Sequence, residues 1–235
     1  MKKTLITLIA LATSALGSIT VENTTAATGA GAAGGFVFTL LDEPVRYNTL
    51  DSNGQALTTL PEVLTLQTIT IDSIYYCNAN ATNDTEYRLR LYVTDANNIV
   101  LGYSDMEMVK VFTANNPNHE ATYEFTFDTD IALSKNEMYK VYFKSTLDED
   151  VASVYDATTK VINTTISKEE LRCNNFLTGL GGNQSEWGVM KTDGTFAGST
   201  GGIAYNISMN LIPEPATATL SLLALAGLAA RRRRK

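Results

Sequence analysis

Apolar and polar residues alternate with a period of two along much of the chain, and this alternation constrains the fold more than any other feature. In the stretch 87–93, Tyr87, Leu89, Leu91 and Val93 fall on one side of an extended chain, and the residues between them fall on the other. A strand with one buried face requires this pattern, because successive side chains point to opposite faces. The sequence therefore predicts strands rather than helices.

The same signal recurs often enough to define a whole domain. Further strands are predicted over residues 36–41, 64–76, 99–103, 123–127, 139–143, 187–191 and 203–211. Groups rich in Asp, Asn and Gly separate them at 51–54, 95–98, 115–118 and 193–194, where such residues favour turns. The capping box at 167–170 predicts one short helix that reaches Cys173. Many strands with almost no helix predict an all-β domain over residues 36–212, an antiparallel β-sandwich of the jelly-roll type.

The N-terminus has the three-part pattern of a secretory signal peptide. Lys2 and Lys3 precede an apolar run over 5–16, and small residues follow. This pattern predicts a signal peptide over residues 1–17, recognised by Sec-type export machinery and removed before Ser18. Residues 18–35 are mostly Thr, Ala, Asn and Gly, a composition that predicts a flexible N-terminal segment.

The C-terminus combines an apolar segment with a basic end. Residues 216–230 carry no charge, and the last five residues are Arg231, Arg232, Arg233, Arg234 and Lys235. A helix of this length rises about 22 Å, somewhat short of the roughly 30 Å hydrocarbon core, so it spans a bilayer marginally. Because a basic cluster is costly to move across the membrane, it holds this end in the cytoplasm. The sequence predicts a precursor anchored in the inner membrane with residues 18–212 outside.

A tripeptide joins the domain to this segment. Pro213, Glu214 and Pro215 stand directly before the apolar run, and the two prolines disfavour a helix there. Tripeptide, apolar helix and arginine cluster over 213–235 together resemble the PEP-CTERM sorting tail of bacterial exported proteins. The resemblance implies processing by an exosortase-like membrane enzyme, a mature form at the cell surface or outside the cell, and association with extracellular polysaccharide. An ordinary single-pass tail anchor is the alternative.

The charge of the exported region excludes one class of partner. The whole chain carries a formal charge of −7, and without the two N-terminal lysines and the basic tail residues 18–212 carry −13. Nucleic-acid binding depends mainly on Lys and Arg that neutralise phosphates. We therefore expect no nucleic-acid partner.

The chain has two cysteines, Cys77 and Cys173, in a region predicted to be exported. In an oxidising compartment they are candidates for one disulfide that closes a long loop. Two unpaired thiols are the alternative. Two cysteines so far apart, with a single histidine, form no recognisable metal-binding motif.

The sequence contains no recognisable catalytic motif. Its acidic residues allow two interpretations, a calcium site or a pair of catalytic carboxylates. His119, the one histidine, lies in a predicted loop, and no nucleophile elbow accompanies it. Asp128 and Asp130, and the cluster with Asp148 and Asp150, are candidates for a structural calcium site, since calcium prefers several oxygen ligands. No other cofactor is expected. Two of these carboxylates would alternatively serve a secreted glycan hydrolase.

Aromatic residues suggest a binding role for the domain. Trp187, the one tryptophan, follows a Gly-rich loop. Tyr75, Tyr76, Tyr92 and Tyr103 are further candidates, and Tyr92 is expected to point away from the core face of its strand. Such rings stack on sugars in polysaccharide-binding proteins, although most aromatic residues of a sandwich lie in the core. The leading prediction is a non-enzymatic, exported β-sandwich that acts as a structural or glycan-binding component of the cell surface or matrix.

Overall fold

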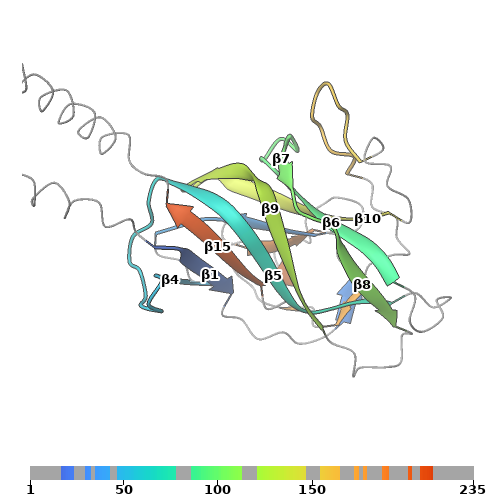
Figure 1. The fold of residues 1–235 in the computed structure, drawn as a ribbon, viewed down its shortest axis with the longest axis horizontal. Helices are drawn as coiled ribbons and strands as arrows, with labels where there is room; N and C mark the ends of the chain where they lie inside the picture. The colour runs from blue at the N-terminus through green and yellow to red at the C-terminus, as the bar shows by residue number, and fades with distance from the viewer. Residues whose placement is uncertain are drawn as a thin grey trace, which may run out of the picture.

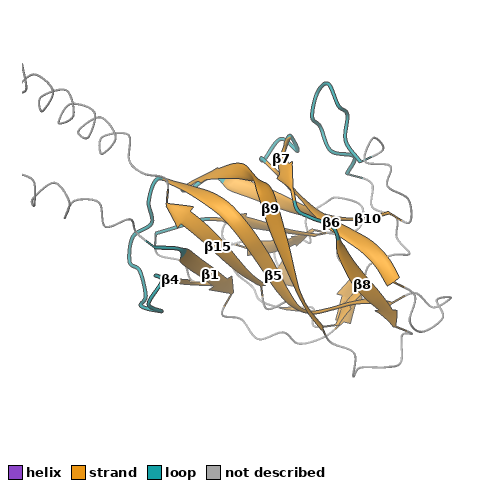
Figure 2. Cartoon of the chain, viewed as in Figure 1, coloured by secondary structure: helices purple, strands orange, loops and turns teal. Residues whose placement is uncertain are grey.

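The computed structural model describes residues 17–23, 30–32, 35–42, 47–77, 86–112, 121–146, 154–164, 172–174, 177–178, 187–190, 201–202 and 207–213. Every regular element among them is a β-strand, and no helix occurs in this part of the chain (Figure 2). The predicted all-β class is confirmed.

The first sheet has five main strands, all antiparallel to their neighbours. Their order is β4 (Tyr47–Leu50), β1 (Ile19–Asn23), β15 (Ile207–Pro213), β5 (Val63–Cys77) and β9 (Ala121–Ser134). Near the end of β5, the short strand β11 (Arg172–Asn174) pairs with it, and β2 (Ala30–Ala32) pairs with β11. The first and last strands of the described chain thus lie beside each other within this sheet.

The second sheet faces the first (Figure 1). Its order is β13 (Trp187–Met190), β3 (Gly35–Thr39), β10 (Met138–Thr146) and β6 (Glu86–Thr94), with both β7 (Val100–Tyr103) and β8 (Glu107–Phe112) on the other side of β6. A short parallel contact between β5 and β8 connects the two sheets. A separate pair is formed by β12 (Leu177–Thr178) and β14 (Gly201–Gly202). Two antiparallel sheets therefore form a sandwich-like fold.

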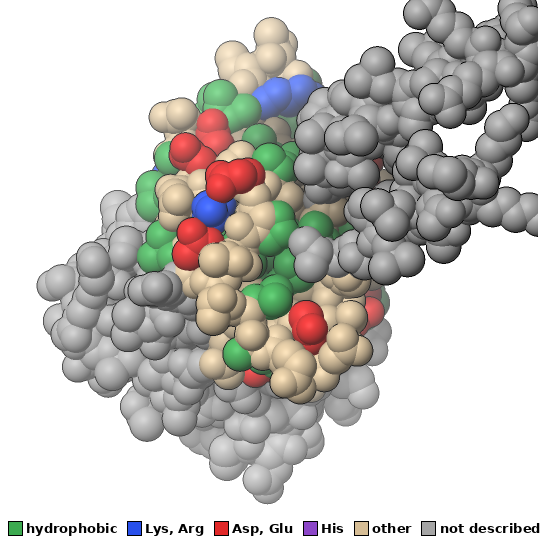
Figure 3. Space-filling model, turned by 90° about the vertical axis from the view of Figure 1, so that its left-hand side faces the viewer, with side chains coloured by type: hydrophobic (Ala, Val, Ile, Leu, Met, Phe, Trp, Pro, Cys, Tyr) green, Lys and Arg blue, Asp and Glu red, His purple; other side chains and the backbone are tan. Residues whose placement is uncertain are grey.

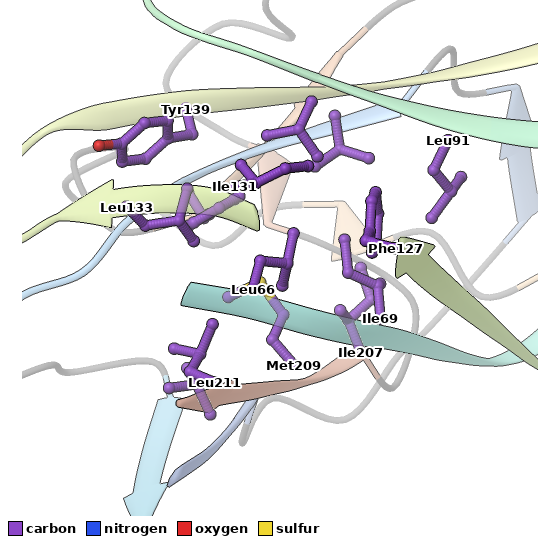
Figure 4. Packing of buried hydrophobic residues seen from close by; sticks show 14 of the residues in the cluster. Leu66, Ile69, Leu91, Phe127, Ile131, Leu133, Tyr139, Ile207, Met209 and Leu211 are labelled. Carbon is purple, nitrogen blue, oxygen red and sulfur yellow. The ribbon is translucent and has the colours of Figure 1, made fainter. Parts of the chain in front are cut away.

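One hydrophobic core fills the space between the sheets. It takes its side chains from the inward positions of both sheets, which point toward one another in Figure 4. In the first sheet, Val21, Met209, Ile69 and Phe125 lie opposite one another on four neighbouring strands, and all four are fully buried. This burial supplies the main driving force for folding, because each such side chain contributes roughly 1.5–3 kcal/mol.

Strand β5 needs an irregularity to bury all its apolar residues. Leu64 and Leu66 are two positions apart, as a regular strand requires, but Leu66 and Ile69 are three apart, although both are fully buried. The pairing of β5 shifts register between Leu66 and Thr68 relative to β9, and β15 shifts its pairing with β5 at the same level. A bulge of this kind inserts an extra residue and restores the inward direction of those that follow.

A glycine brings the edges of the two sheets together on one side. A Cβ atom at Gly102 in β7 would lie 2.6 Å from the Cδ1 atom of Ile131 and 2.7 Å from the Oγ1 atom of Thr129, both on β9. Just beyond β7, the Asp105 amide donates to the Thr126 carbonyl of β9 at 2.7 Å. Absence of a side chain at Gly102 thus permits this close approach.

Aspartates fix three of the turns by the same hydrogen bonds. The Oδ1 atom of Asp51 accepts from the backbone amides of Asn53 and Gln55, each at 2.8 Å, and Gly54 has a positive φ of 76°. Asp95 likewise accepts from the amides of residues 97 and 99, and Asp156 from those of residues 158 and 159. The hydrogen bond that the Gln55 amide donates to Asp51, followed by those from Asn53, lowers the pKa of Asp51. The turns predicted at 51–54 and 95–98 are confirmed.

One end of the sandwich carries an ion-pair network. The Nζ atom of Lys135 lies 2.8 Å from a carboxylate oxygen of Glu62 and 3.1 Å from one of Asp42. The hydrogen bond from the Leu60 amide, followed by the contact with Lys135, lowers the pKa of Asp42. Figure 3 looks onto this end of the molecule, where red acidic side chains flank a blue basic one. The network joins three separate loops.

Three sequence-based expectations differ from the structure. The flexible segment predicted over 18–35 is wrong for β1, because Ile19 and Val21 are 1% and 0% exposed in the middle of the first sheet. Arg172–Asn174, at the end of the predicted helix, is a strand that pairs with β5, while residues 165–171 lie outside the described residues. Strands β4 and β8 were also absent from the sequence-based prediction.

The predicted signal peptide and almost all of the predicted sorting tail lie outside the described residues. Only Pro213 of the tripeptide is described, as the last residue of β15. No segment that the structure describes forms a helix long and apolar enough to cross a membrane.

Candidate functional site

A row of three tyrosines crosses the outer face of the second sheet. Tyr142 of β10 lies opposite Tyr92 of β6, and Tyr92 lies opposite Tyr103 of β7. The ring centroids of Tyr92 and Tyr103 are 5.5 Å apart. Exposure rises along the row, from 0% at Tyr142 and 2% at Tyr92 to 38% at Tyr103. We call these residues the tyrosine row.

Residues 154–164, here called the cover hairpin, bury the inner part of the tyrosine row. Val154 and Ile162 are buried against Tyr92 and Tyr142 in a second, smaller hydrophobic cluster. The backbone of the cover hairpin also bonds to the turn before β7, since the Ile162 amide donates to the Asn98 carbonyl at 3.0 Å. Outward-pointing tyrosines and a separate hairpin thus form a core of their own outside the sandwich.

Two lysines of β10 lie beside the buried tyrosines. Lys144 is 9% exposed, its Nζ atom donates to the Asn163 carbonyl, and burial lowers its pKa to about 8. Lys140 donates to the Asn98 Oδ1 atom at 2.7 Å, and the Tyr142 hydroxyl donates to the same oxygen at 2.7 Å. Burial raises the pKa of Tyr142 to about 12. The hydrogen-bond network connects the sheet, the turn and the cover hairpin.

The exposed end of the row combines an aromatic ring with a guanidinium group. The Cζ atom of Arg90 lies 4.9 Å from the centroid of the Tyr103 ring, within the range of a cation–π contact. The buried Nε atom of Arg90 has no hydrogen-bond partner. Leu101, two residues before Tyr103 on β7, is 41% exposed and adds an apolar side chain to the surface of this strand. A ring held by Arg90 and Tyr92 is an ordered surface on which a sugar or another planar group can stack.

The predicted glycan-binding residues do not form this surface themselves. Tyr92 points away from the main core, as expected, but at 2% exposure under the cover hairpin its ring is not available for stacking on a ligand. Trp187 is the first residue of β13, opposite Phe38, and its side chain lies outside the described residues. Tyr103, another candidate from the sequence, is the ring that is exposed.

The sequence predicts this site only in part. The alternation in β6 places Arg90 and Tyr92 on the face opposite the core, which was predicted. Their contact with Tyr103 depends on the pairing of β6 with β7, and their cover comes from a hairpin some sixty residues later in the chain. Neither the register nor the cover can be derived from local periodicity.

The acidic residues are distributed rather than clustered. Asp128 and Asp130 are exposed on the irregular part of β9, and Asp148 and Asp150 lie outside the described residues. Within the described ranges, no group of three or more His, Cys, Asp or Glu side chains is placed to hold a metal ion. Two carboxylates supply fewer oxygens than calcium's usual six to eight ligands, so a calcium site would need further residues.

The backbone register separates the two cysteines. Cys173 in β11 lies opposite Ile74 of β5, three positions before Cys77. Three residues of a strand span about 10 Å, whereas the Cα atoms of a disulfide lie within about 7 Å of each other. This register does not favour the predicted disulfide, and labelling of free thiols in the native and unfolded protein is its test. His119 lies outside the described residues.

Comparisons with known proteins give no assignment for this site or fold: no protein-family model, curated protein or solved structure matches the chain.

Proposed function

We propose that the protein is exported and sorted by an exosortase-like system, and that its mature domain is a non-enzymatic structural or glycan-binding component of the cell surface or extracellular matrix. Support for export comes from the signal-peptide pattern over 1–17 and the tail over 213–235. Support for a binding role comes from the exposed Tyr103 ring beside Arg90. In this proposal the precursor has the export machinery and an exosortase-like enzyme as partners, and the mature domain has extracellular polysaccharide.

The position of the two chain ends is the observation that carries the proposal. Ile19 of β1 lies opposite Leu211 of β15, so the described chain begins and ends at the same end of the sandwich (Figure 1). In a precursor with a membrane-directed segment at each terminus, both connections leave from this end. The remaining surface is then directed away from the membrane and is free for extracellular contacts.

The sheet also limits where the tail can be cut. Pro213 is paired with Leu64 at the end of β15, and the preceding Leu211 is fully buried between β1 and β5. A processing enzyme needs an accessible, unpaired segment, and bonds before Pro213 are held in the sheet. We therefore place the cut after Pro213, so that the mature domain keeps all of β15.

The strand order supports the jelly-roll interpretation of the fold. One sheet contains the order β1, β15, β5, β9, and the other contains β3, β10, β6, β8. Along the sequence, paired strands that are far apart, such as β1 and β15, enclose paired strands that are closer together, such as β6 and β8. A jelly roll with two Greek keys has this nested order. The other strands extend this frame at its edges.

Export and sorting can be tested in bacteria with and without an exosortase. We expect residues 18–213 to be accessible to protease on intact cells, with a membrane-bound precursor accumulating when the exosortase is absent. A variant that lacks residues 216–235 serves as a control, because it should be exported without membrane retention. Recovery of the intact domain from the cytosol of exosortase-competent cells would contradict the proposal.

A further inference from the structure

The outer face of the first sheet carries two regular rows of side chains, which we call the polar rows. The first row is Leu50, Thr20, Asn210, Thr68 and Thr126, and the second is Asn48, Glu22, Ser208, Thr70 and Glu124, each in the strand order β4, β1, β15, β5, β9. In every strand the two rows flank an inward residue, for example Val21 between Thr20 and Glu22. All ten side chains therefore point outward together.

This face is open in the described part of the chain. Asn48, Glu124 and Thr126, on the two outer strands, are exposed, and the other seven residues are half-buried. The Oδ1 atom of Asn210 is buried and has no hydrogen-bond partner. Figure 1 shows β1, β15, β5 and β9 side by side, with no described strand in front of them. The face differs in this respect from the tyrosine row, which has its own cover hairpin.

The chemical groups of the polar rows indicate which class of ligand they can bind. Seven of the ten residues carry a hydroxyl or amide group, two are glutamates, and Leu50 is the one apolar residue. No Lys or Arg occurs among the ten, and Asp128 and Asp130 continue the acidic edge along β9. An apolar partner would find little surface to bury, and a polyanion would be repelled. Uncharged molecules with many hydroxyl groups match the hydrogen-bonding groups, and the acidic side chains do not repel them.

The rows are also ordered before any ligand binds. Neighbouring strands lie about 4.8 Å apart and alternate residues of one strand about 6.7 Å apart, so donors and acceptors repeat on a fixed lattice. Threonine side chains have few rotamers on a strand, so they lose little entropy on binding. A repeating array on a sheet face suits a long polymer better than a small molecule, which needs a concave pocket.

We propose that the polar rows bind an extended, uncharged polysaccharide, with Thr68 and Thr70 at the centre of the contact. This inference rests on the proposed function, and it names the surface and the class of glycan. The hydroxyl and amide groups indicate a glycan, and the negative charge of the face disfavours an acidic one.

Co-sedimentation of the full-length protein, purified in detergent, with insoluble polysaccharides tests the inference. Microcrystalline cellulose and an insoluble β-1,3-glucan are the uncharged probes, and cross-linked polygalacturonate is the acidic one. The variant Thr68→Lys places a long charged side chain in the middle of the first row. Thr68→Ser keeps the hydroxyl, and Thr158→Lys adds the same charge in the cover hairpin. Thermal melting checks that each variant is folded.

We expect the wild type to sediment with at least one uncharged probe and not with polygalacturonate. Thr68→Lys should lower the apparent affinity at least about tenfold, which corresponds to about 1.4 kcal/mol, whereas Thr68→Ser and Thr158→Lys should stay within about twofold. Binding that is lost with Tyr103→Ala but kept with Thr68→Lys would overturn the inference while leaving glycan binding in place.

Three other results would also overturn the inference: no binding to any uncharged probe, equal binding to polygalacturonate, or a wild-type dimer that Thr68→Lys dissociates. The cell-fractionation experiment on export is independent of all these outcomes, so failure of the polar rows is distinguishable from failure of the proposed function.

Discussion

The two outer faces of the sandwich follow the same alternation of inward and outward residues, yet one is open and the other is partly covered. On the first sheet the outward residues of the polar rows are mainly Thr, Asn, Ser and Glu. On the second sheet they include the tyrosine row, and the cover hairpin buries Tyr92 and Tyr142. Short polar side chains are well solvated, whereas adjacent tyrosine rings gain from burial. The size and polarity of outward residues thus decide which face acquires a second layer.

The largest expected difference between the faces is in their contribution to stability. Tyr92→Ala removes a ring that is 2% exposed from the cluster under the cover hairpin, and we expect it to cost about 3 kcal/mol or more. Thr70→Ala, at a matched outward position of the open face, should cost less than about 0.5 kcal/mol. Urea unfolding of both variants measures the difference. Equal midpoints would mean that the cover hairpin adds no stabilising layer.

The covered face should also give the protein an alkaline stability maximum. The pKa of Lys144 is about 8 when folded and about 10.5 when unfolded, so the unfolded state binds more protons between these values and stability rises with pH. The gain from pH 7 to pH 10 is on the order of 2 kcal/mol. Above pH 10 the sign reverses, because the folded pKa of Tyr142, about 12, exceeds its ordinary value of 10.

The Lys144→Met variant is the control for this pH dependence. It removes the more strongly perturbed amine from the covered face and should remove most of the rise between pH 8 and pH 10, while the smaller part from Lys140, whose pKa is also lowered by burial, and the fall above pH 10 remain. Unfolding free energies measured across this range, for wild type and variant, provide the comparison. A wild-type profile that is flat from pH 7 to pH 10 would show that Lys144 is not held in a desolvated position.

A smaller effect concerns the exposed end of the tyrosine row. Arg90 and Tyr103 are within cation–π distance, and we expect a coupling energy of about 0.5–1 kcal/mol between them. A double-mutant cycle with Arg90→Met and Tyr103→Leu measures this coupling. Additive effects of the two changes would mean that Arg90 does not stabilise the orientation of the ring.

Local periodicity predicted the class of the fold but not its arrangement. The inward residues of β6, β9 and β10 were predicted because apolar residues alternate there with polar ones. Strand β1 was missed because only Ile19 and Val21 carry its signal, within a segment dominated by Thr, Ala and Asn. Its burial depends on β15, the last strand of the described chain, and such distant pairing leaves no mark in a local pattern.

The candidate site shows the same limit. Alternation placed Tyr92 on the outer face correctly, and this led to its interpretation as an exposed glycan platform. The cover hairpin reverses that conclusion, and the pairing of β6 with β7 leaves Tyr103, another candidate from the sequence, as the exposed ring. The polar rows likewise follow from the pairing register of five strands that come from distant parts of the sequence.

Intact-mass measurement of the protein released by exosortase-competent cells tests export and sorting most directly. We predict a chain that begins at Ser18 and ends after Pro213, with the basic cluster of residues 231–235 removed. Two structural reasons support these limits, since β1 begins at Ile19 and β15 holds Pro213 in the sheet. A released species that retains Arg231 to Lys235, or one that ends before Pro213, would contradict the prediction.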